Sequence, residues 1–156
     1  MQRRLLSALA GVVMLLTPAA WAHEFGIGDL VIEHPWIRAT PDAAEVAAGF
    51  MSITNAGGEA DRLIAVVSPV AGTVQIHEMT VENDVMKMQE LPEGLEIPAG
   101  ATIELKPKSY HLMFMKLQEQ LKEGDTVEAE LVFQKAGAIT IQFVVEPADA
   151  QDHMQM

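Results

Sequence analysis

Histidine and methionine recur together at three places in this 156-residue chain. The three places are His77-Glu78-Met79, His111-Leu112-Met113 and His153-Met154-Gln155-Met156. Thioether sulfur is a soft donor and imidazole nitrogen a borderline one, so this combination favours Cu(I) over Zn²⁺, Ca²⁺ or Mg²⁺. The chain has no cysteine, which excludes thiolate metal sites, disulfides and a blue-copper centre.

The spacing within these segments places the donors on one side of a strand. Side chains two residues apart share a face of a β-strand. In the segment 111–115 the histidine and both methionines therefore share a face, while Leu112 and Phe114 point to the opposite, core-facing side. Met86 and Met88 share a face of another short strand in the same way. A face of histidine and methionine opposite a Leu/Phe face is poorly explained by burial alone.

Single histidines and methionines can also have ordinary structural roles. A lone methionine such as Met51 is usually a core residue that fills an irregular gap. His34, directly before Pro35, has the sequence context of an ordinary surface or turn residue. The methionine-rich strands could also form a soft apolar patch that another protein covers.

Almost every segment that must position these residues has the pattern of a strand. The expected strands are residues 29–33, 35–40, 48–55, 62–67, 74–77, 85–88, 102–105, 111–115, 127–133 and 139–145. An acidic loop over residues 78–84 is expected between the fifth and sixth of these. Short strands separated by Gly, Pro and Asn turns predict a single-domain, all-β antiparallel sandwich. Only residues 117–122 have a helical pattern, and that segment is very short.

The first 22 residues have the pattern of a secretory signal peptide. Two arginines precede an apolar run that Pro18 ends, and a small-x-small motif ends at Ala22. The run is shorter than a membrane span requires, and no cysteine follows it to carry a lipid, so no membrane anchor is expected. We therefore expect cleavage after Ala22, a periplasmic protein, a domain over residues 23–147 and a flexible polar tail over residues 148–156.

The overall charge restricts the partners. The chain has 22 acidic and 10 basic residues, a formal net charge of -12. A surface this acidic repels phosphate backbones and anionic lipid, so binding to nucleic acid is not expected. Cations and basic protein surfaces are the expected partners.

Three segments together match a known family. The first is H-E-M-T-V-E-N-D-V-M-K-M at residues 77–88, the second G-L-E-I-P-A-G at residues 94–100, and the third L-K-P-K-S-Y-H-L-M at residues 105–113. They resemble the periplasmic PCu(A)C copper chaperones, whose signature is a histidine, ten residues, a methionine, 21 or 22 residues and then H-x-M. Here ten residues separate His77 from Met88, and 22 separate Met88 from His111.

This resemblance implies a cupredoxin-like β-sandwich. We expect a single Greek-key domain that is a monomer and is not an enzyme. The resemblance implies that Cu(I) is held at an exposed position by His77, Met88, His111 and Met113. It also implies delivery of copper toward the binuclear copper centre of cytochrome c oxidase, whose copper-bearing subunit would be a partner, alongside Sco-type copper proteins.

The match departs from the signature at one position. The signature allows a methionine directly after its first histidine, but Glu78 stands there. Met79, one residue later, is therefore not taken as a ligand. Met86 and Met115 are treated as neighbours of the ligands only.

The C-terminal tail repeats the same donor types within four residues. His153, Met154 and Met156 are a candidate secondary copper site. Histidine nitrogen together with Asp152 would also accept Cu(II), which a thioether-rich site disfavours. The tail could instead be a chance C-terminal sequence without a function.

Two other functions could use some of the same residues. A copper-dependent enzyme could use His23 as an N-terminal chelating residue, but no second histidine is suitably spaced and aromatic residues are few. A copper-buffering or resistance protein would store the ion without a dedicated acceptor and would use the same ligands. Sequence alone does not separate that protein from a chaperone.

Overall fold

The computed structural model describes residues 24–150, and this part of the chain is built from strands. The strands are β1 (Glu24–Ile27), β2 (Leu30–Arg38), β3 (Val46–Asn55), β4 (Asp61–Val67), β5 (Ala71–Glu82), β6 (Val85–Glu90), β7 (Leu95–Ile97), β8 (Thr102–Leu105), β9 (His111–Leu117), β10 (Thr126–Phe133) and β11 (Gly137–Glu146). Over these residues no helix is long and apolar enough to cross a membrane. The expected signal peptide over residues 1–22 lies outside the described residues.

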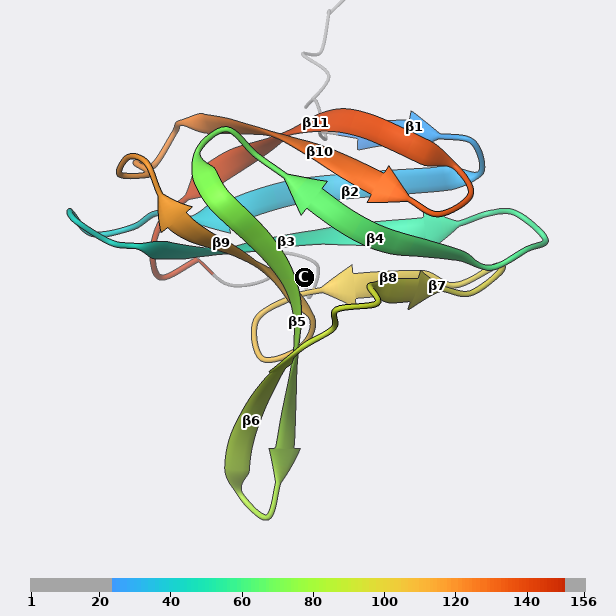
Figure 1. Cartoon of the computed structure of the whole chain (residues 1–156), viewed down its shortest axis with the longest axis horizontal. Coiled ribbons are helices and arrows are strands. Elements are labelled where there is room, and N and C mark those ends of the chain that lie inside the picture. The colour runs from blue at the N-terminus through green and yellow to red at the C-terminus, as the bar shows by residue number, and fades with distance from the viewer. Residues whose placement is uncertain (1–23, 151–156) are drawn as a thin grey trace, which may run out of the picture.

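Seven strands form a closed ring. Their order is β2-β11-β10-β4-β5-β9-β3, and a further pairing between β2 and β3 closes the circuit (Figure 1). The other four strands extend this ring at its edges: β1 on β2, β8 on β3, β7 on β4 and β6 on β5. The all-β, cupredoxin-like sandwich predicted from the sequence is confirmed. It is not purely antiparallel, because β2 and β11 run parallel to each other.

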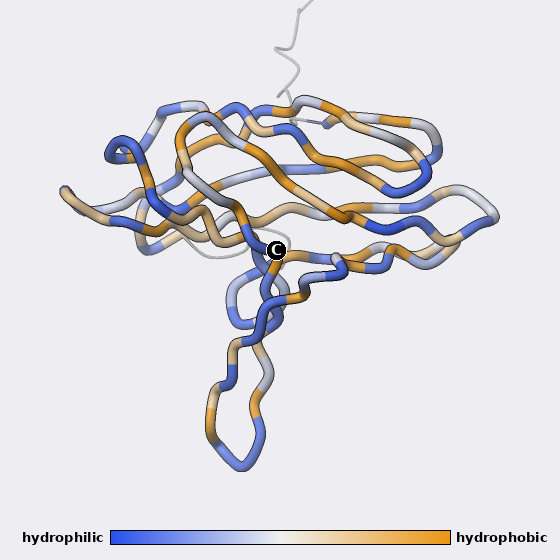
Figure 2. The backbone as a smooth tube through the Cα atoms, viewed as in Figure 1, coloured by the Kyte–Doolittle hydropathy of each residue, from blue (hydrophilic) through white to orange (hydrophobic). Residues whose placement is uncertain are grey.

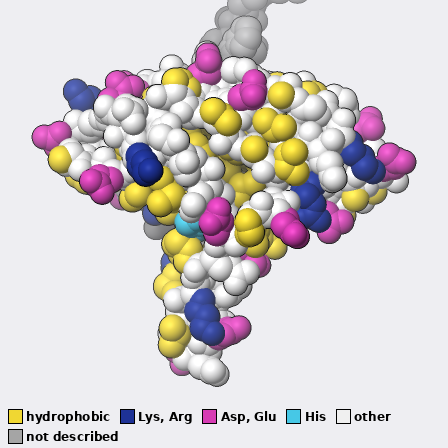
Figure 3. All heavy atoms as spheres, viewed as in Figure 1, with side chains coloured by type: hydrophobic (Ala, Val, Ile, Leu, Met, Phe, Trp, Pro, Cys, Tyr) yellow, Lys and Arg dark blue, Asp and Glu magenta, His cyan; other side chains and the backbone are white. Residues whose placement is uncertain are grey.

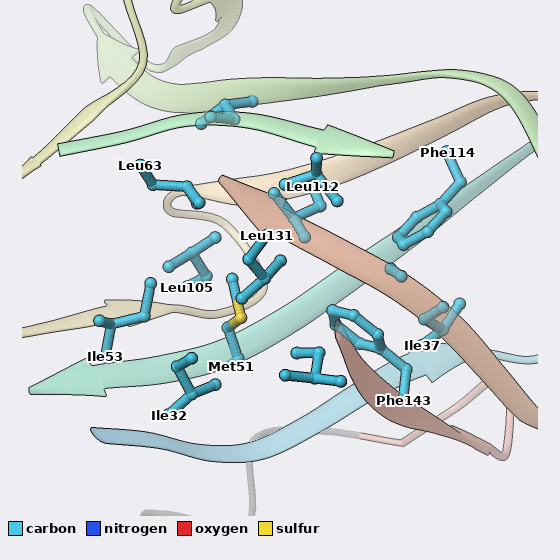
Figure 4. Packing of buried hydrophobic residues seen from close by; sticks show 14 of the residues in the cluster. Ile32, Ile37, Met51, Ile53, Leu63, Leu105, Leu112, Phe114, Leu131 and Phe143 are labelled. Carbon is cyan, nitrogen blue, oxygen red and sulfur yellow. The ribbon is translucent and has the colours of Figure 1, made fainter. Parts of the chain in front are cut away.

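Alternation of buried and exposed side chains is clearest in β10. In β10 the residues Val127, Ala129 and Leu131 are buried, whereas Glu128 and Glu130 between them are exposed. Corresponding residues from the other strands meet inside the ring (Figure 4). Burial of this apolar surface is the main stabilising term, at roughly 25 cal/mol per Å².

The β9 strand is fixed in place by one of these core contacts. Phe114 is fully buried, and its ring meets Phe143 edge-on with the centroids 5.8 Å apart. Gly49 of β3 lies beside it, and a Cβ atom there would approach Phe114 Cε2 to 2.7 Å. Because Gly49 has no side chain, β3 can pack closely against Phe114 of β9. This packing fixes the position of β9, the strand that carries His111 and Met113. Met51 is buried in the core, in agreement with the interpretation from the sequence.

The strand β2 differs from the expectation of two strands split at His34-Pro35. It is continuous, with a shift in its pairing to β3 between Glu33 and Trp36. His34 takes a positive φ of 49° at this irregularity, and its Nε2 lies 3.1 Å from Glu146 Oε1. A local bulge therefore accommodates the proline without ending the strand.

The expectation of an acidic loop over residues 78–84 is wrong. These residues continue β5 into a hairpin with β6, which extends away from the sandwich as an arm (Figure 1). The turn consists of Asn83 and Asp84, with φ values of 51° and 63°. Two consecutive positive φ values give a tight hairpin turn, for which Asn and Asp are favoured residues.

The ordered domain also extends beyond the expected boundary at residue 147. Ala150 is only 9% exposed and packs against Trp36 and Phe50 on the outer face of the sheet. Arg38 Nη2 donates a hydrogen bond to the Ala150 carbonyl oxygen at 3.4 Å. The first part of the expected tail is therefore packed against the sandwich. Its His/Met segment lies outside the described residues.

Candidate metal centre

The two central histidines of the sequence motif face each other across neighbouring strands. His77 of β5 pairs directly with His111 of β9, and their ring centroids are 5.4 Å apart at an interplanar angle of 74°. The preceding pair in the ladder, Ile76 and Leu112, is buried in the core. Alternation therefore places both imidazoles on the outer face of the same two strands. Met113 is two residues further along β9 and shares that face.

His111 is the more deeply buried of the two histidines, with only 4% of its surface exposed. Its Nδ1 lies 3.1 Å from the carbonyl oxygen of Ser109. A carbonyl oxygen can only accept, so Nδ1 carries the proton and donates this hydrogen bond. The lone pair on Nε2 remains available, and the hydrogen bond fixes the ring orientation, as is usual for metal-binding histidines.

His77 has the complementary arrangement. Its Nε2 donates to Gln75 Oε1 at 2.8 Å, which leaves the lone pair on Nδ1. That Nδ1 is buried and has no hydrogen-bond partner among residues 24–150. Burial lowers the pKa of His77, the neighbouring His111 lowers it further, and Glu90 acts in the opposite direction. The lowered pKa favours the neutral imidazole, the form that binds a metal ion.

Met88 approaches the site from the hairpin arm. It pairs directly with Met79 in the β5–β6 ladder and is 48% exposed. Together with His111 and Met113 it lines a pocket of about 220 Å³. His77 is not part of this pocket wall, but it contacts the His111 ring at its edge. All four residues of the motif therefore lie on one face of β6, β5 and β9.

The structure adds two methionines to this pocket. Met79 and Met86 both line it, although neither was expected to be a ligand. The signal for Met79 was present in the sequence, since it is two residues from His77 and shares its face of β5. By contrast, Met115 pairs with Thr73 and lies outside this pocket.

Residues on the outer face of the sandwich also line the pocket. They include Ala48, Phe50 and Arg38, whose guanidinium carbon lies 5.5 Å from the centroid of the Phe50 ring. Pro107 and Lys108 complete the lining. Figure 3 shows hydrophobic side chains along the arm and a histidine where the arm joins the body. The pocket is thus apolar, rich in sulfur and open to one side.

The carboxylates of residues 78–84 do not line the pocket. Within the hairpin, Glu78 and Glu82 lie on the face opposite to the methionines, and Glu82 forms an ion pair with Lys87. The charged side chains that line the pocket are Arg38 and Lys108. In residues 24–150 no group of three or more His, Cys, Asp or Glu side chains could hold a metal ion. The donors available here are two imidazoles and thioethers, a set that suits a soft cation.

The sequence of the chain matches a family of proteins named as lipoproteins. The model of the LpqE-like lipoprotein family matches residues 30–145. Lxx21020, a protein of Leifsonia xyli subsp. xyli (strain CTCB07) that is also named as a lipoprotein, is 28% identical over 129 residues. This alignment covers 83% of the present chain and 76% of that protein.

Solved structures give a more specific match. The copper-bound PCuAC domain from PmoF2 is 30% identical, with a TM-score of 0.70, over 80% of this chain and 98% of that domain. The apo PCuAC domain from PmoF1 is 29% identical, with a TM-score of 0.69, over 80% and 99%. Cu(I)-bound DR1885 from Deinococcus radiodurans, at 24% identity and a TM-score of 0.61 over 85% of each chain, shares the fold. The chain belongs to the LpqE-like family and is a member of the PCuAC copper-chaperone family indicated by its His/Met motif.

Proposed function

We propose that this protein is a periplasmic copper chaperone, exported with cleavage after Ala22, that binds Cu(I) and passes it to another protein. The ligands in this proposal are His77, Met88, His111 and Met113. The observation that carries it is the meeting of the two imidazoles and the thioethers on one face of β5, β6 and β9. The copper-bound state of the similar PmoF2 domain supports copper as the ion.

The donor set explains the preference for Cu(I). Each of the four ligands is neutral, so the bound ion keeps a single positive charge in a mostly apolar pocket. A divalent ion would place a larger charge there, and no carboxylate lines the pocket. Glu90, opposite His77 in the β5–β6 ladder, lies on the same face but outside the lining. Thioether sulfur also disfavours the harder Cu(II), Zn²⁺ and Mg²⁺.

The unequal burial of the ligands suits reversible binding. His111 is 4% exposed and hydrogen-bonded to the backbone, whereas Met88 is half-exposed on the arm. An incoming ligand from an acceptor protein can therefore replace Met88 first. The two imidazoles, which are less exposed than Met88, would hold the ion until the exchange is complete.

Replacing single ligands tests the site. Met88→Leu keeps the volume and apolar character of the side chain but removes the sulfur, so the fold should remain intact. We expect the Cu(I) affinity of Met88→Leu and of His111→Ala to fall about a hundredfold or more. Loss of a residue that only supports a metal ligand already lowers metal affinity by about tenfold to a hundredfold. Anaerobic titration against a chromophoric Cu(I) chelator measures the affinity.

The matched control for this experiment is Met115→Leu. This methionine lies on the same strand as His111 but outside the pocket. Its affinity should equal that of the wild type. If Met88→Leu and His111→Ala also bind Cu(I) like the wild type, the proposed ligand set is wrong.

The proposed acceptor is the copper-bearing subunit of cytochrome c oxidase, reached together with Sco-type copper proteins. This part of the proposal rests on the His/Met motif. A storage protein with the same ligands is the alternative, and transfer distinguishes them. We expect the Cu(I)-loaded protein to load the soluble copper domain of the oxidase subunit, or a Sco-type protein, faster than it loses Cu(I) to buffer. Retention of all the copper in the presence of both acceptors would favour storage.

We also propose that the C-terminal segment with His153, Met154 and Met156 binds a second copper ion, which can be Cu(I) or Cu(II). The position of Ala150, directly before this segment, supports the role. Ala150 packs against Phe50 and accepts a hydrogen bond from Arg38, and both residues line the pocket. A short tether of this kind keeps its donors at a high effective concentration near the site.

Truncation after Ala150 tests the role of the tail. This end point preserves the packing of Ala150, which truncation after Pro147 would remove. The truncated protein should keep the affinity of the tight Cu(I) site, whereas a second Cu(I) or a Cu(II) ion should bind more weakly. Equal stoichiometries and affinities for both ions in the two proteins would exclude a copper-binding tail.

A further inference from the structure

One face of the hairpin arm is lined with methionine beyond what the His/Met motif requires. In the β5–β6 ladder Met79 lies directly opposite Met88, and Val81 lies opposite Met86. These four side chains share the face that carries His77. The other face carries polar residues, namely Glu78, Thr80, Glu82, Lys87 and Gln89, together with Val85. Figure 2 shows hydrophobic and hydrophilic residues alternating along both strands of the arm.

Core packing does not explain these methionines. Met86 is 54% exposed and Met88 48% exposed, on an arm that lies outside the sandwich. Both, with Met79, line the pocket that contains His111 and Met113. Three thioethers at the open end of a pocket are a soft donor set of their own.

The geometry of the ladder allows the three sulfurs to converge on one ion. Directly paired residues in an antiparallel sheet have Cβ atoms about 4.5–5.5 Å apart, and diagonal neighbours about 7–8 Å apart. Met79 and Met88 form a direct pair, while Met79 and Met86 are diagonal neighbours. The three rotatable bonds of methionine let the sulfurs cover these distances. Met88 is then common to this trio and to the proposed inner site.

We propose that Met79, Met86 and Met88 form an outer, all-thioether Cu(I) site that exchanges its ion with the inner site through the shared Met88. This inference rests on the proposed function and extends it. As the ion moves inward, the bonds from copper to the sulfurs of Met79 and Met86 break, and bonds to the imidazoles of His77 and His111 and to the sulfur of Met113 form. Copper stays in the Cu(I) state throughout. No proton is released, because thioethers carry none and the imidazoles bind copper in their neutral form.

The double variant Met79→Leu/Met86→Leu tests the outer site in the full-length protein. Both substitutions keep an apolar side chain of similar volume and leave all four ligands of the inner site in place. The inner site should still bind Cu(I), with an equilibrium affinity well above that of Met88→Leu. The rate at which Cu(I) transfers from a chromophoric chelator, followed by stopped-flow absorbance, should fall by about tenfold or more, because the high effective concentration of the outer donors is lost. Met115→Leu is the matched control and should transfer at the wild-type rate.

A second variant measures the outer site directly. In His77→Ala/His111→Ala, Cu(I) should still bind, more weakly than in the wild type and with sulfur as its principal protein donor in X-ray absorption. Adding Met79→Leu and Met86→Leu to this variant should weaken the remaining binding and lower the number of sulfur donors, because only Met88, Met113 and the C-terminal donors are left. Equal affinity and an equal number of sulfur donors with and without these two substitutions would overturn the proposal.

The possible failures are distinguishable. If the wild type itself does not bind Cu(I), the proposed function fails. If the wild type binds but Met79→Leu/Met86→Leu transfers Cu(I) at the same rate, only the outer site is wrong. If the equilibrium affinity of this double variant falls as far as that of Met88→Leu, the two methionines belong to the inner site and an outer site is excluded.

Discussion

The pairing of β5 with β9 is the contact on which the candidate site depends. His77 and His111 are opposite each other only because this ladder has one register, and the buried pair Ile76 and Leu112 fixes that register. If either strand slipped by one residue, its histidine would turn into the core and its large apolar side chain would be exposed. The hydrophobic effect that stabilises the sandwich therefore also aligns the metal donors.

The site lies at the junction between the sandwich and the hairpin arm. At His77 the strand β5 changes neighbours: before it the chain pairs with β9, and after it the chain pairs with β6 in the arm. The imidazoles are thus held by the rigid sandwich, whereas Met88 is supplied by an exposed hairpin. Rigid placement limits the loss of entropy on binding. Exposure of the thioether end keeps the ion accessible to an acceptor protein.

The fold class and most strands followed from alternation, since β10 and β11 have clear polar/apolar periodicity and turn residues between them. The arm was missed because its acidic residues resemble a solvent-exposed loop. Apolar and polar residues alternate over residues 78–81, as expected for a strand. The high content of acidic residues in this segment obscured that pattern. The irregularity at His34 and the packing of Ala150 depend on tertiary contacts that a local pattern does not contain. Likewise, Met79 could be placed in the pocket only once the pairing with Met88 was known.

In the proposed copper site, two imidazoles and two thioethers from three strands bind one Cu(I) ion together. X-ray absorption spectroscopy of the protein loaded anaerobically with one equivalent of Cu(I) tests this arrangement most directly. We expect two nitrogen and two sulfur donors in the wild type, and in Met88→Leu the loss of one sulfur while both nitrogens remain. A coordination sphere with fewer than two nitrogens, or one without sulfur, would contradict the claim.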